Sequence, residues 1–346
     1  MIEENPKRTE LSELGEFGLI DHLTKKFETR QQSTLKGVGD DAAVLDYGRK
    51  KILLSTDLLI EGVHFDLTYV PMKHLGYKAA IVNFSDIVAM NGTPKQITVN
   101  ISVSNRFSLQ AIEELYSGIF LACEKYNVDL IGGDTSSSSA GLYISITVVG
   151  EADHQDITFR DKAKEKDLLC VTGDLGAAYI GLLILEREKT VYKADPNMQP
   201  DLQGYDYVLE RQLKPEARTD ITKLFKELNV KPNSMIDISD GLASEILHIC
   251  KQSKVGCNIY EEKIPIDITT SNHSNELKID PTTAAMNGGE DYELLFTISM
   301  EDYKKVEGNT NISVIGHITH QNEGVNLISR SGTMVPVTAQ GWDALK

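Results

Sequence analysis

Two linked segments decide how this chain is interpreted: Gly37-Val-Gly-Asp-Asp-Ala-Ala-Val-Leu and, after a polar turn at 46–51, Ile52-Leu-Leu-Ser-Thr-Asp57. The glycines permit tight backbone turns, so we expect Asp40 and Asp41 to be presented at the end of a loop. The run 51–56 is short, apolar and partly β-branched, which predicts a buried strand carrying Ser55, Thr56 and Asp57 at its carboxyl end. Oxygen ligands of the kind that Mg²⁺ prefers then converge from two segments.

Carboxylates beside Gly, Ser or Thr recur later in the chain. A single motif of this kind is most often a turn or a helix cap, but the recurrence favours an assembled magnesium and phosphate site. The spacing matches no EF-hand loop. Asp86 is conspicuous because it lies inside an otherwise apolar helical pattern, where an unpaired carboxylate is rare. The later motifs are Ser85-Asp86, Gly133-Asp134, Asp237-Ile-Ser-Asp240 and Gly289-Glu290-Asp291.

Composition indicates a soluble globular protein of about two domains, because the chain has 346 residues, 41% hydrophobic and 25% charged. We place the division at 1–152 and 153–346. The net charge of −16 argues against nucleic acid or an anionic membrane as an electrostatic partner. The four cysteines show no Cys-x-x-Cys spacing, which predicts reduced, buried thiols. With no signal peptide or membrane span in the pattern, we expect a cytoplasmic protein.

Periodicity predicts alternating helices and strands in both halves, hence an α/β or layered α+β fold with each domain a sheet covered by helices. Residues 190–216 are polar and show a less regular hydrophobic pattern than the rest. Gly132-Gly-Asp-Thr is expected to form a turn that exposes Asp134. We expect helices at 11–28, 72–90, 108–126 with Ser108 as N-cap, 177–188 and around 218–228, and strands at 95–104, 128–131, 142–150 and after Asp291. The segment 168–176 is expected to be a strand and a Gly-rich turn, and 234–250 a short strand whose end opens a helix.

Several common nucleotide and catalytic motifs are absent from the sequence: a Walker A loop, a Gly-x-Gly-x-x-Gly turn, His-Glu-x-x-His and a Gly-x-Ser-x-Gly elbow. A nucleotide could still bind, provided several Mg²⁺ ions neutralise its phosphates and bridge them to aspartates. Three other residues have two interpretations: His64 is a packed or a substrate-binding histidine, Arg160 is a surface charge or a phosphate contact, and Trp342 docks the tail or stacks on a ligand.

The ordered set of motifs resembles the thiamine-monophosphate kinase family, over nearly the whole chain. The motifs are the Gly37 loop, Ser55-Thr-Asp, Gly62-Val-His-Phe, Lys78-Ala-Ala-Ile-Val-Asn-Phe-Ser-Asp, Gly132-Gly-Asp-Thr, Asp237-Ile-Ser-Asp-Gly and Gly288-Gly-Glu-Asp-Tyr-Glu-Leu. The resemblance implies ATP-dependent phosphorylation of thiamine monophosphate to thiamine diphosphate. It also implies the two-domain fold of the aminoimidazole ribonucleotide synthetase superfamily and a homodimer formed through the N-terminal domains.

The resemblance also implies roles for particular residues. Asp57, Asp86 and Asp134 are the expected catalytic carboxylates; Gly133, Arg160 and Ser239 are expected to contact ATP; His64, Glu290 and Trp342 are expected to hold thiamine monophosphate. The expected Mg²⁺ ligands are Asp41, Ser55, Thr56, Asp57, Asp86, Asp134, Asp237 and Asp240. Because the acceptor is itself a phosphate, no strong general base is required, and we expect direct in-line transfer.

Two alternatives remain open at this point. One is another ATP-using member of the superfamily, such as an aminoimidazole ribonucleotide synthetase or a selenophosphate synthetase, although no cysteine precedes the Gly37 loop as the latter requires. The other is a catalytically silent protein that binds magnesium and nucleotide and regulates a partner. The intact set of aspartates argues against this second alternative, because a protein without catalytic activity readily loses its metal ligands.

Overall fold

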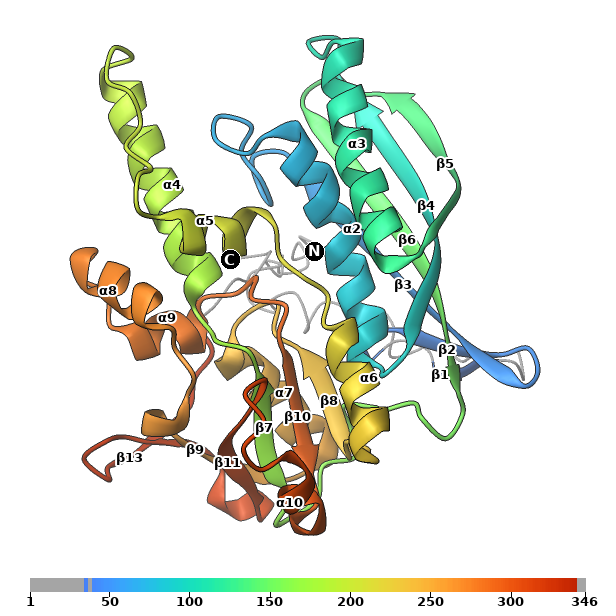
Figure 1. Cartoon of the computed structure of the whole chain (residues 1–346), viewed down its shortest axis with the longest axis vertical. Coiled ribbons are helices and arrows are strands. Elements are labelled where there is room, and N and C mark those ends of the chain that lie inside the picture. The colour runs from blue at the N-terminus through green and yellow to red at the C-terminus, as the bar shows by residue number, and fades with distance from the viewer. Residues whose placement is uncertain (1–33, 37–38, 341–346) are drawn as a thin grey trace, which may run out of the picture.

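The protein, seen here in a computed structural model, is described over residues 34–36 and 39–340, where two sheets are covered by helices (Figure 1). The first sheet has the strand order β1-β2-β3-β6-β4-β5 and the second has the order β13-β12-β9-β11-β7-β10-β8. The expected α/β architecture is confirmed. The predicted opening helix at 11–28 lies outside the described residues.

The first sheet is antiparallel except for the parallel pair β4 and β5. One face, which carries the fully buried Leu53, Ile97 and Ile146, packs against two helices, whereas no helix among the described residues covers the other face (Figure 1). The strands are β1 Thr34–Lys36, β2 Ala43–Asp46, β3 Lys50–Ile60, β4 Thr93–Val103, β5 Asp129–Ser137 and β6 Leu142–Asp153, and the helices are α2 Met72–Ala89 and α3 Leu109–Tyr126. Ser108 caps α3 by accepting a hydrogen bond from the Ala111 amide, as predicted.

Helix α2 is the central element of the molecule. It is buried on nearly all sides because it packs on α3, on the first sheet and against β8 of the second sheet. A helix covered all round needs no polar face, which explains why its sequence is apolar almost throughout. The two charged side chains in its middle and last turns, Lys78 and Asp86, are therefore placed inside the protein.

The second sheet comes from the rest of the chain, and α4 projects away from it at the upper left of Figure 1. Its strands are β7 Leu168–Thr172, β8 Ser234–Asp237, β9 Gly256–Tyr260, β10 Leu294–Ile298, β11 Ile312–Thr319, β12 Val325–Ile328 and β13 Met334–Pro336. Its helices are α4 Ala177–Ala194, α5 Asp206–Leu213, α6 Thr219–Leu228, α7 Leu242–Ser253, α8 Ile268–Glu276, α9 Pro281–Asn287 and α10 Tyr303–Val306.

Three local predictions were wrong. Ser55, Thr56 and Asp57 lie in the middle of β3, not at its end, because pairing with β6 continues as far as Ile60. The expected turn at 132–135 is part of β5, since β4 supplies hydrogen-bond partners along its length. The region 190–216 contains α5.

One hydrophobic cluster spans the two halves, and two further clusters among the described residues lie within the second half. The spanning cluster joins Phe84 of α2, Phe225 of α6 and Phe296 of β10, and the centroids of the last two rings lie 5.0 Å apart, edge to face. The first sheet draws its strands from residues 34–153 and the second from 168–336. The domain division near residue 152 stays a prediction, because the packing is continuous across it.

Cys123, Cys170, Cys250 and Cys257 are free and buried, as predicted. Within residues 34–36 and 39–340, no helix combines the length and the apolar character that crossing a membrane requires.

Candidate active site

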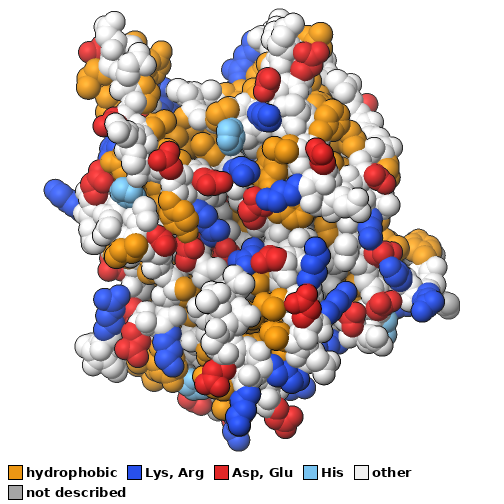
Figure 2. Space-filling view, in the orientation of Figure 1, with side chains coloured by type: hydrophobic (Ala, Val, Ile, Leu, Met, Phe, Trp, Pro, Cys, Tyr) orange, Lys and Arg blue, Asp and Glu red, His pale blue; other side chains and the backbone are white. Residues whose placement is uncertain are grey.

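A cleft of about 1280 Å³ lies between the two halves of the molecule. On the face shown in Figure 2, acidic, basic and histidine side chains gather below the hollow that separates the tip of α4 from α3. The cleft brings together most of the predicted site residues from segments that lie far apart in the sequence. Those lining it are Asp41, Ser55, Asp57, His64, Asp86, Arg160, Asp237, Ser239, Asp240 and Glu290.

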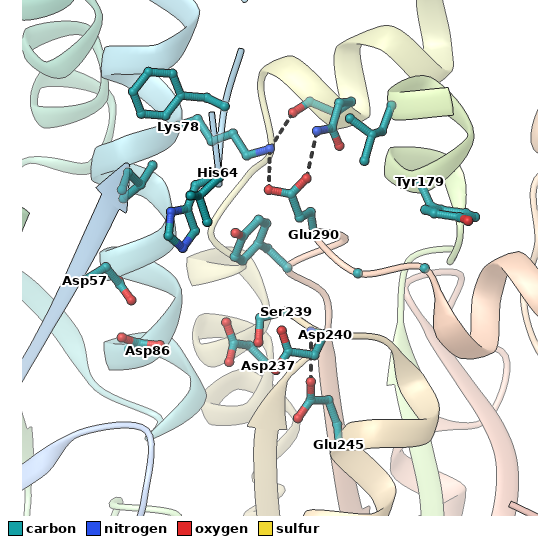
Figure 3. Close-up of a pocket in the computed structure, with 18 of the residues that line it drawn as sticks. Asp57, His64, Lys78, Asp86, Tyr179, Asp237, Ser239, Asp240, Glu245 and Glu290 are labelled. Carbon is teal, nitrogen blue, oxygen red and sulfur yellow. Dashed lines mark hydrogen bonds and ion pairs between the residues drawn. The ribbon is translucent and has the colours of Figure 1, made fainter. Parts of the chain in front are cut away.

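Three carboxylates form the acidic floor of this cleft, and two of them, Asp86 and Asp237, are labelled in Figure 3. Asp41 precedes β2, Asp86 lies in the last turn of α2, and Asp237 ends β8, yet one oxygen from each lies within 4.8 Å of the others. The hydroxyl of Ser55 donates to Asp86 over 2.5 Å, and that of Ser85 donates to Asp237 over 2.5 Å. The second bond joins α2 directly to β8, so the two halves of the chain orient each other's carboxylates.

Burial and mutual repulsion raise the pKa values of these acids. Burial raises the pKa of Asp57 to about 6. Burial, with the nearby Asp41 carboxylate, raises the pKa of Asp237 to about 8. The pKa of Asp86 lies well above its usual range, first through burial and then through Asp57 and Asp237. Such a cluster holds protons near neutral pH unless a cation replaces them.

The donor set fits Mg²⁺. Every ligand atom that these side chains offer is a hard carboxylate or hydroxyl oxygen, which is the chemistry magnesium requires. Oδ2 of Asp57 is buried and accepts no hydrogen bond from residues 34–36 or 39–340, so within the described protein its lone pairs are unused. An unpaired buried carboxylate oxygen is costly, and a bound cation would remove that cost.

Arg160 approaches the floor from the side. Its Nη2 lies 2.7 Å from Oδ1 of Asp41, and its Nε donates to Oδ2 of the same residue over 3.2 Å. Neighbouring Asp40 has a pKa raised to about 7 by burial and by Asp41, against the opposing effect of Arg160 and Lys36. Arg160 and Lys36 therefore place positive charge beside the carboxylates at this end of the cleft.

Glu290 occupies the opposite wall of the cleft, above the acidic floor in Figure 3. The segment around it is strained, because Glu290 and Tyr292 have φ angles of 65° and 51°. The amide of Glu290 donates to the Ser239 carbonyl over 2.7 Å. A Cβ on Gly289 would lie 2.4 Å from that same carbonyl oxygen, so only glycine permits this close approach between the two site segments.

His64 lies beside the cleft in the connection between β3 and α2. Its Nδ1 accepts the Ile60 amide hydrogen over 3.0 Å. The hydrogen of the neutral ring is consequently on Nε2, which makes that nitrogen a donor.

Three predicted residues lie elsewhere. Thr56 points to the outer face of the first sheet, where its hydroxyl donates to the Ile146 carbonyl, while Asp57 points inward. Gly133 and Asp134 belong to the exposed edge strand β5 and do not line the cleft. Trp342 lies outside the described residues.

Comparison with known proteins decides the family. Residues 39–152 match the AIR synthase related protein, N-terminal domain. A thiamine-monophosphate kinase of Aquifex aeolicus is 35% identical, with the alignment covering 96% of this chain and 98% of that one. This chain belongs to the thiamine-monophosphate kinase family. The kinase of Bacillus subtilis is 32% identical over 96% of this chain and all of its own length.

Solved structures agree with this membership. A structure of AaThiL complexed with AMPPCP and TMP superposes with a TM-score of 0.82 at 32% identity, covering 98% of this chain and 99% of that chain. The hydrogenase maturation protein HypE in complex with ATP, at 17% identity and a TM-score of 0.65 over 96% of this chain and 98% of its own, shares the fold alone. The family recognised from the sequence motifs is confirmed.

Sequence reasoning missed three residues in the cleft of this thiamine-monophosphate kinase family member. Lys78 and Gln212 contact Glu290, and Glu245 accepts a hydrogen bond from the Asp240 amide over 3.0 Å. Burial raises the pKa of Glu245 well above its usual range, and Asp240 raises it further. Lys78 carried a detectable signal, since a lysine in an apolar helix is as unusual as the aspartate eight residues later. Gln212 and Glu245 carried none.

Proposed function

We propose that the cleft transfers the γ-phosphoryl group of ATP to the phosphate of thiamine monophosphate, giving ADP and thiamine diphosphate. The observation that carries the proposal is the trio of carboxylates from Asp41, Asp86 and Asp237, gathered within 4.8 Å at one end of a cleft whose other wall holds Glu290. Family membership supports the same reaction. So does the similar structure complexed with AMPPCP, an ATP analogue, and TMP, which we take as thiamine monophosphate.

In this proposal Asp41, Ser55, Asp57, Asp86 and Asp237 hold Mg²⁺, with Asp240 beside them. When bound, Mg²⁺ supplies positive charge that offsets the repulsion between the two anionic phosphates. Arg160 and Ser239 contact ATP, while His64, Glu290 and Trp342 hold thiamine monophosphate.

The chain's own contribution to the chemical step is positioning. An oxygen of the substrate phosphate forms a bond to Pγ of ATP as the bond from Pγ to the β,γ-bridging oxygen breaks, and ADP leaves with that electron pair. The acceptor is already an oxyanion, so no side chain has to remove a proton from it. Nε2 of His64, as a donor, is suited to orient the acceptor phosphate. Trapping a phosphorylated protein after incubation with labelled ATP would contradict direct transfer.

We further propose a homodimer formed through the face of the first sheet that no described helix covers. That face exposes Leu58, Tyr143 and Ile131, which are 53%, 37% and 61% exposed. Exposed apolar side chains on an open sheet are typical of protein interfaces. Three predicted ligands of metal or nucleotide lie on this sheet away from the cleft: Thr56, Gly133 and Asp134. If they bind metal or nucleotide, we propose that they do so at the dimer interface. A monomeric mass in solution with full activity would contradict the dimer.

The cytoplasm remains the proposed location, supported by four free, buried thiols that suit a reducing compartment.

The reaction is tested by measuring ADP release with Mg-ATP while thiamine monophosphate, thiamine and aminoimidazole-pathway substrates are offered separately. Of these acceptors, we expect only thiamine monophosphate to support turnover. Asp57→Asn should abolish it, because the substitution replaces a negatively charged carboxylate with a neutral amide at the proposed metal site. ATP use with a different acceptor would retain the fold and overturn the substrate. Absence of turnover with any acceptor would favour the silent magnesium-nucleotide binding protein.

A further inference from the structure

Glu290 is held by two neighbours that come from different helices. Nζ of Lys78, in α2, lies 2.7 Å from Oε1 of Glu290 and also donates to the Gln212 carbonyl over 3.0 Å. Nε2 of Gln212, in α5, donates to Oε2 of Glu290 over 2.7 Å. Figure 3 shows these bonds converging on the carboxylate at the upper wall of the cleft.

This arrangement fixes the carboxylate in one orientation. Lys78 is only 7% exposed and Gln212 only 5%, so neither side chain can easily move away into solvent. A buried ammonium is tolerated only when it is paired, which ties Lys78 to Glu290. The Glu290 side chain itself remains 31% exposed, and each of its oxygens can accept a second hydrogen bond. Those remaining acceptor sites are available to a ligand in the cleft.

The pairing also determines what kind of ligand group Glu290 can recognise. Thiamine offers two candidates, the permanently charged thiazolium and the neutral exocyclic amine of its aminopyrimidine ring. The Lys78–Glu290 pair has no net charge, so its attraction for a fixed cation is largely cancelled. A neutral N–H donor, in contrast, still forms a strong hydrogen bond to an ionised carboxylate oxygen. The geometry therefore favours the amine.

Helix α2 places this wall relative to the acidic floor. Lys78 and Asp86 are eight residues apart on the same helix, a rise of about 12 Å at 1.5 Å per residue. The middle of α2 thus supports the ring-binding wall, and its last turn supplies a carboxylate to the phosphate end. An extended thiamine monophosphate has the same order of groups, with the aminopyrimidine at one end and the phosphate at the other.

We propose, resting on the function proposed above, that Lys78 is a positioning residue that holds Glu290 to accept a hydrogen bond from the exocyclic amine of the aminopyrimidine ring. Lys78 thereby determines specificity for that amine without touching the reacting phosphates. Gln212 assists from the other oxygen of the same carboxylate.

The test compares thiamine monophosphate with oxythiamine monophosphate, in which a carbonyl oxygen replaces the amine, using kcat/KM for each. We expect the unaltered enzyme to prefer the amine by about tenfold or more, the usual effect of one hydrogen bond to a charged acceptor. Lys78→Met should raise KM for thiamine monophosphate by about tenfold and reduce the preference to about threefold or less, with KM for ATP and kcat little changed. Lys78→Arg should restore part of the preference.

Lys51→Met is the matched control, because Lys51 is similarly buried at 9% exposed and pairs with Asp46 over 2.7 Å in the β2–β3 hairpin, outside the cleft. It should keep the full amine preference. If Lys78→Met fails to fold, Gln212→Leu replaces it and should also reduce the preference.

An active enzyme whose preference is unchanged in the folded Lys78 or Gln212 variant would overturn this proposal and leave the kinase function standing. An unaltered enzyme with no turnover of thiamine monophosphate would overturn both.

Discussion

At the scale of single residues, the acidic floor keeps carboxylates in places that are unfavourable for them without a cation. Asp237 illustrates this, because it is 3% exposed and its pKa is raised to about 8 by burial and by Asp41. A side chain retained at such a cost is expected to serve the reaction and not the stability of the fold.

Asp237→Asn should therefore separate activity from stability. We expect kcat/KM to fall by about a hundredfold or more, since a ligand that holds phosphate-neutralising charge is lost. At pH 8 and above, the metal-free melting temperature should stay the same or rise, because a neutral amide of the same shape replaces a buried carboxyl group that ionises there. Kinetics and thermal melting in a chelator measure both, with Asp46→Asn in the exposed hairpin as the control. A large loss of metal-free stability would assign Asp237 a structural role instead.

The sequence identified residues whose local pattern is unusual by itself. Asp86 was identifiable because a carboxylate interrupted an apolar helix, and Asp237 because Ser239 and Asp240 follow it. Gln212 was not identifiable, since its contact with Glu290 joins positions 78 residues apart along the chain. Such pairings depend on how helices meet, and no short window of sequence contains that information.

At the scale of elements, β5 shows how pairing overrides local preference. Gly132 and Gly133 are typical turn residues, yet both lie in β5 because β4 supplies a parallel partner for each. The same reason extends β3 beyond Asp57, where β6 pairs with every residue from Lys50 to Ile60. Helices α2 and α3 were predicted closely, since helical hydrogen bonds are local and their periodicity is visible in the sequence.

The two adjacent glycines of β5 provide a matched pair of variants. Gly133 has a φ of 154°, and a Cβ there would lie 1.8 Å from the Val99 carbonyl oxygen, whereas a Cβ on Gly132 would meet no atom within 4 Å. Gly133→Ala should force β5 from β4 and destabilise the protein by about 1–3 kcal/mol. Gly132→Ala should change stability by less than about 0.5 kcal/mol. Chemical denaturation measures both; equal effects would mean that β5 does not pack on β4 as described.

At the scale of the whole molecule, the acidic cluster links folding to pH and to magnesium. Asp57 and Asp237 have pKa values raised to about 6 and about 8 in the folded protein, mainly by burial. In the unfolded chain an aspartate titrates near pH 4. The folded protein thus keeps protons that the unfolded chain has released, and metal-free stability should fall as pH rises from about 4 through about 8.

Magnesium should reverse that loss, because it binds the ionised carboxylates and competes with their protons. We expect the increase in melting temperature caused by millimolar MgCl₂ to be small near pH 5 and largest near pH 8, where fewer protons must be displaced. Thermal melts across this range, with chelator or MgCl₂, measure the effect, and Asp237→Asn should reduce both the metal-free loss and the magnesium gain. A magnesium gain independent of pH, or unchanged in that variant, would place the cation away from the floor formed by Asp41, Asp86 and Asp237. The joint dependence is specific to a site in which α2 and β8 bring carboxylates from both halves of the chain together, since neither half alone contains the cluster.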